Sequence, residues 1–149
     1  MDKTMQSYDF RALASSILNE AGIAYEYEQG DPAADGAFGD ATAVFRVSNF
    51  LLRLVRDRGQ IFADIAASTR PDRFFQMDDL DVALGISNQL EIVARSEPED
   101  IRRALARLNS LRDTYSAALT PESLDDTMRA VAAAAKCRGK LMLSQSGST

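Results

Sequence analysis

Residues 41–66 read ATAVFRVSNFLLRLVRDRGQIFADIA, and this stretch decides the fold. It contains three runs rich in β-branched, aromatic and other apolar residues, at 41–47, 50–56 and 60–66, which are typical of strands. Asp57-Arg58-Gly59 separates the last two runs, and its glycine is free to adopt a positive φ angle. Because these connections are too short to hold a crossover helix, the three strands are predicted to form an antiparallel meander.

The residues before this stretch predict one helix and one further strand. At 8–21, apolar side chains recur at helical spacing, and Gly22 follows at the position where helices commonly end. At 23–28, bulky and charged residues alternate, as they do in a half-exposed strand. The loop at 29–40 is rich in glycine and aspartate. The meander is therefore expected to span residues 23–66 with three or four strands.

The residues after this stretch predict a helical part at 72–143. A short helix is expected around 78–84, where Gly85 ends it, and a helical turn or short helix at 87–95. Ser96-Glu97-Pro98-Glu99 fits a capping box, in which Ser96 caps a helix and Glu99 reaches back to the cap.

The helix that follows the capping box carries an apolar stripe as far as Tyr115. Thr120-Pro121 is expected to start the last long helix, and residues 144–149 are expected to fray. Together these patterns predict one α+β domain over residues 1–149, with an N-terminal helix, a three- to four-stranded antiparallel meander, and a C-terminal helical half packed on the sheet.

The charge of the chain favours a protein partner over nucleic acid. The 149 residues carry a net charge of −5, and the isoelectric point is near 4.7. Binding to phosphates needs a basic surface, so an acidic chain is expected to bind a basic protein if its partner is charged. The N-terminus does not resemble a secretory signal and no segment has the length of a membrane span, so a cytoplasmic location without membrane contact is expected.

The composition also argues against common catalytic chemistry. The chain has no histidine and a single cysteine, Cys137, which removes the familiar serine and cysteine triads and the common zinc sites. We therefore expect a protein that is not an enzyme, with no catalytic residues, no bound metal and no cofactor. Cys137 follows a run of alanines and is expected to be a buried or half-buried thiol.

Two groups of aspartates are the candidate contacts to a partner. The loop at 31–40 matches only some positions of a calcium-binding loop, since Ala33 and Thr42 occupy two ligand positions, so a partner-binding loop or a solvated hairpin loop remains open alongside ion binding. A second acid cluster lies at the start of a predicted helix, where carboxylates also favour the helix dipole. The partner-binding candidates are Asp31, Asp35, Asp40, Asp78, Asp79 and Asp81.

The arginines have simpler expected roles. Arg53 is expected to pair across the hairpin with an acid such as Asp64. A second group is expected to form a solvated face of the helix that follows the capping box. Its members are Arg102, Arg103, Arg107 and Arg112.

Part of the chain resembles the small bacterial immunity proteins that neutralise polymorphic or contact-dependent toxins. The similar residues are FLLRLVRDRGQIFADI at 50–65, RFFQMDDL at 73–80, and Leu84-Gly85, within roughly residues 44–85. In that family a strand ends in an arginine-rich turn, a "QxFxD" strand follows, and an aromatic and acidic segment opens a short helix. The resemblance implies a protein without catalytic activity that binds a toxin and blocks it.

Two other functions are compatible with the sequence. Chaperones of type III secretion are also small, acidic α+β proteins, and they act as dimers around an extended effector segment. An enzyme that uses carboxylates or calcium is the third alternative, and a deep pocket with two close acids would favour it.

Overall fold

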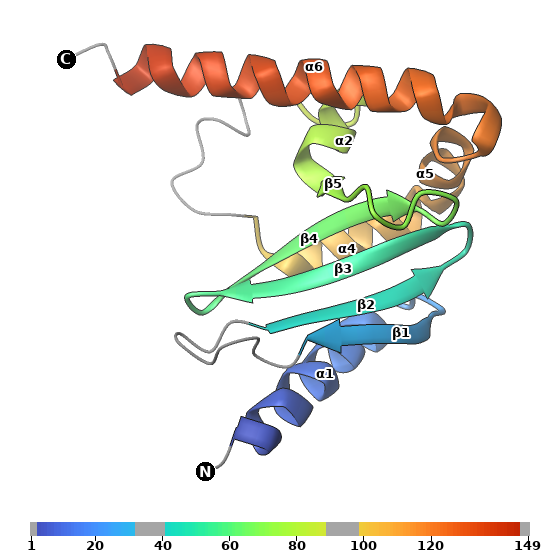
Figure 1. Cartoon of the computed structure of the whole chain (residues 1–149), viewed down its shortest axis with the longest axis vertical. Coiled ribbons are helices and arrows are strands. Elements are labelled where there is room, and N and C mark those ends of the chain that lie inside the picture. Colours follow the sequence, from blue (N-terminus) through green and yellow to red (C-terminus); the bar gives the residue numbers. More distant parts are fainter. Residues whose placement is uncertain (1–2, 32–40, 89–98, 147–149) are drawn as a thin grey trace.

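The computed structural model describes residues 3–31, 41–88 and 99–146, and within them the predicted α+β fold is confirmed (Figure 1). An N-terminal helix precedes a five-stranded antiparallel sheet, and helices follow. The strand order in the sheet, β1-β2-β3-β4-β5, is the order along the chain. The elements are α1 (Lys3–Glu20), β1 (Glu26–Asp31), β2 (Ala41–Val47), β3 (Phe50–Asp57), β4 (Gln60–Ala67), β5 (Phe75–Gln76), α2 (Met77–Ala83), α4 (Ile101–Ser110), α5 (Arg112–Ala118) and α6 (Pro121–Ser146).

The end of α1 has the geometry that Gly22 predicts. Gly22 has a φ of 77°, its N–H donates to the carbonyl of Asn19, and the N–H of Ile23 donates to the carbonyl of Leu18. This pair of bonds is a Schellman motif, which satisfies carbonyls that the helix leaves open. The helix starts at Lys3, five residues before its predicted start, and β1 starts at Glu26 where 23 was expected.

Replacing Gly22 with alanine is expected to lower the free energy of unfolding by about 1 to 2 kcal/mol, because a left-handed conformation is strained for a residue with a Cβ. The new Cβ would also lie 3.3 Å from Nδ2 of Asn109. Urea denaturation of both proteins measures the difference. An unchanged midpoint would show that this turn relaxes without cost.

The hairpin of β3 and β4 forms as the sequence predicts. Arg58 and Gly59 both have positive φ angles, 54° and 82°, which is the signature of a type I′ turn. The register pairs Asp57 with Gln60 at the turn and Arg53 with Asp64 farther along. Arg53 donates to Oδ2 of Asp64 at 2.8 Å, so the expected pairing of these two residues is confirmed.

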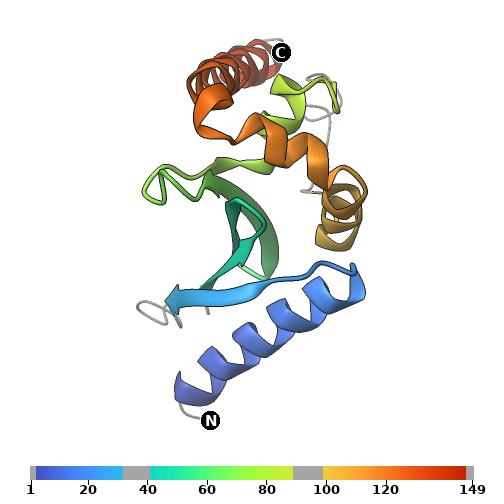
Figure 2. The ribbon, with the colours of Figure 1, turned by 90° about the vertical axis from the view of Figure 1, so that its right-hand side faces the viewer.

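The core lies between one face of the sheet and the helices α1, α2, α4 and α5, and α6 adds Leu124 and Val131 to it (Figure 2). Alternate residues of β2, β3 and β4 point to this face, because side chains alternate along a strand. The largest fully buried side chains are Phe10, Ile17, Leu18, Phe45, Phe50, Leu52, Leu54, Ile65, Leu80, Leu105, Leu108 and Tyr115.

The C-terminal helices depart from the sequence-based expectation at three points. The cap of α4 is Asp100, whose side chain accepts from the N–H of Arg102. Ser96, the predicted cap, lies outside the described residues, as does most of the possible helix at 87–95. The predicted single helix is broken at Leu111, which separates α4 from α5. Pro121 starts α6 as predicted, but α6 continues to Ser146, into the segment expected to fray.

An ion pair joins α6 to α2. Nε and Nη2 of Arg138 donate to the two carboxylate oxygens of Asp79 at 3.0 and 3.1 Å. Cys137, the neighbouring residue, is exposed, so the expectation of a buried or half-buried thiol was wrong. It lies on the outer side of a helix whose inner face is taken by apolar residues such as Leu124 and Val131.

Candidate functional site

Within the described residues, strand β4 is paired along only part of the edge that faces away from β3. On that edge β5 pairs with Asp64 and Ile65 alone. The chain then turns into α2 at Met77, because β5 has only two residues. Among the described residues, no strand therefore pairs with residues 60–63 on this side. We call residues 60–63 the open edge of β4.

The hairpin register fixes which backbone groups the open edge presents. In a two-residue hairpin the pair that closes the turn, here Asp57 and Gln60, is hydrogen-bonded, and hydrogen-bonded pairs then alternate with non-bonded pairs. The N–H of Ser68 donates to the carbonyl of Asn49. This pair falls at a hydrogen-bonded position of the same alternation, which confirms the register. The N–H and C=O groups of Ile61 and Ala63 therefore point away from β3, toward the open edge.

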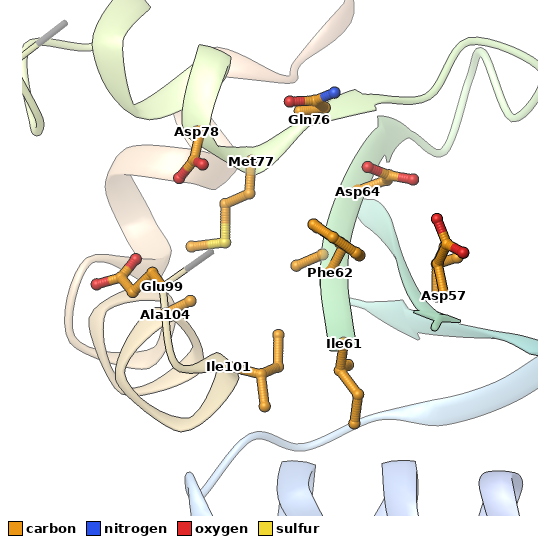
Figure 3. A pocket seen from close by; sticks show the side chains of 12 residues that line it. Asp57, Ile61, Phe62, Asp64, Gln76, Met77, Asp78, Glu99, Ile101 and Ala104 are labelled. Atoms are coloured by element: carbon orange, nitrogen blue, oxygen red, sulfur yellow. The ribbon is translucent and has the colours of Figure 1, made fainter. Parts of the chain in front are cut away.

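A pocket of about 310 Å³ lies beside the open edge, between β4, α2 and α4 (Figure 3). Its apolar lining on the helical side consists of Met77, Ile101 and Ala104, and Ile61 faces them from β4. We call this the β4-edge pocket. The residues that line it are Val55, Asp57, Ile61, Phe62, Ala63, Asp64, Gln76, Met77, Asp78, Glu99, Ile101 and Ala104.

Carboxylates lie on both sides of this pocket. Asp57 and Asp64 are on the strand side, and Asp78 and Glu99 are on the helical side (Figure 3). The twelve lining residues include no lysine or arginine, although Arg53 contacts Asp64 from outside the pocket. The side chain of Phe62 is 37% exposed beside these acids. An apolar surface flanked by acids suits a ligand that has both apolar and basic groups.

A buried network supports the helical side of the pocket. Arg107 donates from Nη1 and Nη2 to the two oxygens of Glu99 at 2.8 and 2.9 Å, and from Nη2 to Oδ2 of Asp81 at 2.7 Å. The hydroxyl of Tyr115 donates to Oδ1 of Asp81. The expectation that Arg107 belongs to a solvated helix face was wrong, because its guanidinium joins α2 to α4 and to Glu99.

The network changes the acidity of its members. Burial raises the pKa of Asp81, and the hydrogen bond from Tyr115 and the charge of Arg107 oppose this shift only in part. Burial and the hydrogen bond to Asp81 raise the pKa of Tyr115. Burial alone would lower the pKa of Arg107, but its bonds to Glu99 and the charge of Asp81 raise it. Arg107 therefore stays charged beside its two carboxylates.

The raised pKa of Asp81 predicts a pH-dependent effect of the substitution Asp81→Asn. A carboxyl with a raised pKa in the folded state contributes most below its ordinary pKa of 3.8, and this contribution declines as pH rises through the folded pKa. Asparagine does not titrate, so the stability of the variant relative to the native protein should increase as pH rises from about 3.5. Urea unfolding of both proteins over this range measures the difference, and the opposite slope would contradict the direction of the shift.

The structure describes the backbone of four of the six predicted contact residues. Asp31 ends β1, and Asp35 and Asp40 lie outside the described residues, as does most of the possible calcium loop. Asp78 lines the β4-edge pocket.

Asp79 and Asp81 require a correction as candidate contacts. They are 3% and 0% exposed and are bonded to Arg138, and to Arg107 and Tyr115, respectively. Neither carboxylate is presented to a partner, because each balances a buried or half-buried arginine. Side chains at neighbouring positions of a helix point in different directions, so the acids of α2 face different surroundings. The sequence alone did not show which of these acids would be buried.

Several pocket residues were not singled out from the sequence. Asp57 was assigned only to a turn, Phe62 only to a predicted strand, and Glu99 to a capping box. Phe62 carried a usable signal, since it is an aromatic residue on the strand face opposite Ile61, Ala63 and Ile65. The two-residue strand β5 carried no usable sequence signal. Without knowing where β5 ends, the open edge of β4 could not be located from the sequence.

Comparisons with known protein families, with curated proteins and with solved structures found no match to this chain. None of the described helices is both long enough and apolar enough to cross a membrane. Within the described ranges, no group of three or more acidic or cysteine side chains is placed to hold a metal ion.

Proposed function

We propose that this protein acts by binding a basic protein partner at the β4-edge pocket, and that the partner is a toxin domain whose action it blocks. The observation that carries the proposal is the pocket itself, which combines strand backbone that no strand of the described residues pairs, an apolar lining, and four carboxylates, two of which already accept from Arg53 and Arg107. Acids that flank a contact surface speed association with a basic partner and select against acidic ones. The toxin is the partner class that the resemblance of residues 44–85 implies.

The exposed aromatic ring of Phe62 adds to this proposal. Aromatic residues at the centre of a contact surface supply much of the binding free energy when they become fully buried. Phe62 is exposed in the free protein and lines the pocket together with Asp57 and Asp64 (Figure 3). A partner that covers this ring would also bring its basic groups within reach of both acids.

The test compares two variants that change the net charge equally. Asp57→Lys with Asp78→Asn alters the pocket, and Asp125→Lys with Glu122→Gln alters exposed acids on α6 that do not line it. Each tagged protein is used to capture partners from its native host, and captured proteins are quantified by mass spectrometry. The pocket variant should retain about tenfold less of the partner, and the α6 variant should retain all of it.

A second experiment tests whether the captured partner is a toxin. The partner is expressed in a host that lacks this protein, with and without co-expression of the native chain. Growth arrest that the native chain relieves and the pocket variant does not relieve is the expected result. Equal capture by the two variants would reject the pocket as the binding site, and a harmless partner would reject the toxin.

The open edge of β4 also suits a chaperone that holds an extended segment of its client. Light scattering on the purified protein separates the two functions. The chaperone reading requires a dimer, and an immunity protein that binds its toxin one to one would be a monomer.

A further inference from the structure

We propose that the partner binds by strand addition: an extended segment of it lies along the open edge of β4, in line with β5, and alternates apolar and basic side chains. This inference rests on the proposed function, because it assigns the binding mode of the same pocket. It goes further in naming which backbone groups and which side-chain pattern the protein recognises.

The backbone of β4 is already arranged for a further strand. The N–H and C=O groups of Ile61 and Ala63 point toward the pocket, and Ile65 in the same series faces Phe75 of β5. A segment that continues the line of β5 would therefore extend the ladder past the point where the chain turns away at Met77. Main-chain hydrogen bonds of this kind supply affinity in peptide recognition by sheet edges.

The two sides of the added segment would meet different surroundings. Side chains opposite Ile61 and Ala63 would point toward the helical side, where Met77, Ile101 and Ala104 form an apolar lining (Figure 3). Because side chains alternate along a strand, the intervening ones would point to the opposite face of the sheet.

That opposite face carries Asp57, the ring of Phe62, and Asp64 in its ion pair with Arg53. Asp57 pairs with Gln60, and Arg53 pairs with Asp64, so both aspartates lie on the same face of the sheet as Phe62. Basic side chains of the added segment would lie against the ring of Phe62, whose aromatic face favours a cation, and on the same face of the sheet as the carboxylates of Asp57 and Asp64. The occupant is therefore an extended segment in which apolar and basic residues alternate.

A defined peptide probe tests this mode directly. The probe is a blocked octapeptide of four Val-Lys repeats, and the first control has the same composition with the valines and lysines in separate blocks. A second control carries N-methyl groups on alternate residues of the repeat peptide, which removes backbone donors without changing charge. Binding is followed by NMR titration of the native protein.

The repeat peptide should bind about tenfold more tightly than either control, because each control loses the side-chain register or two or more hydrogen bonds. It should shift the amide signals of Ile61 and Ala63 most. Equal affinity of the three peptides would overturn strand addition.

The substitution Ala63→Pro extends the test to the partner captured from the host. Proline removes the outward N–H of residue 63 and leaves the bonds of β4 to β3 in place, as is tolerated at strand edges. Loss of the partner in Ala63→Pro, with a circular dichroism spectrum like that of the native protein, supports strand addition. Loss of the partner in the Asp57 and Asp78 variant, with full retention in Ala63→Pro and equal binding of the peptides, would reject strand addition and leave the proposed function standing.

Discussion

Replacing Arg107 with alanine is expected to lower the free energy of unfolding by about 3 to 5 kcal/mol, because removing one partner of a buried ion pair leaves the other charge without compensation. The side chain of Asp81 is fully buried, and its bonds come from Arg107 and Tyr115. Glu99 would lose its two bonds to the same guanidinium. Urea denaturation followed by circular dichroism measures the loss.

Arg102→Ala on the same helix is the matched control for this effect. Arg102 contacts Glu20 at 3.1 Å, but both side chains are more than half exposed, so the expected loss is below about 1 kcal/mol. Adding Asp81→Asn to Arg107→Ala should restore part of the stability, since it removes the uncompensated carboxylate. Similar losses for Arg107→Ala and Arg102→Ala would show that the network does not stabilise the fold.

Replacing Phe45 with alanine is expected to cost about 3 to 5 kcal/mol, the range for an aromatic side chain removed from a packed core. Phe45 is fully buried on β2. Its ring meets those of Tyr25 and Tyr27 edge to face, at centroid distances of 5.1 and 5.7 Å, and such pairs add to the effect of burial alone. Thermal and urea unfolding both report the change.

Phe62→Ala provides the contrast within the same sheet. This ring is exposed at the β4-edge pocket, so its removal should cost less than about 1 kcal/mol of stability. If Phe62 contacts the partner, the same substitution should nevertheless weaken binding. A large loss of stability in Phe62→Ala, or a small one in Phe45→Ala, would contradict the assignment of the two faces.

The sheet was predictable because each strand carries its own signal. The bounds of β2 were predicted without error, and those of β3 and β4 to within one residue, because alternation and the Arg58-Gly59 turn mark both their faces and their ends. The end of α1 was predictable for the same reason, because the residue after the helix has a positive φ angle, which favours glycine, and Gly22 occupies that position. In each of these cases the deciding interactions are local in sequence.

The features that could not be predicted depend on contacts between distant residues. β5 has two residues, and it is a strand only because Asp64 and Ile65 pair with it. The break at Leu111 lies within an apolar stripe that continues on both sides. From the sequence, Asp81 was predicted to be a surface acid. In the structure it is bonded to Arg107 and Tyr115, which follow it by 26 and 34 positions.

The candidate site shows the same division. The acidic character of the β4-edge pocket agrees with the net charge of the chain, and Asp78 was among the predicted residues. The pocket arises because β4 is longer than β5, and because α4 lies beside the part of β4 that β5 does not pair. Its position is therefore a property of strand lengths and helix placement, which no single motif in the sequence encodes.

Hydrogen exchange of the β4 amides tests the open edge most directly. NMR of the free protein in deuterated buffer should show fast exchange at Ile61 and Ala63, and slow exchange at Phe62 and Asp64, whose N–H groups face β3. Slow exchange at all four amides would show that the edge is already paired, and a partner strand could not then bind there.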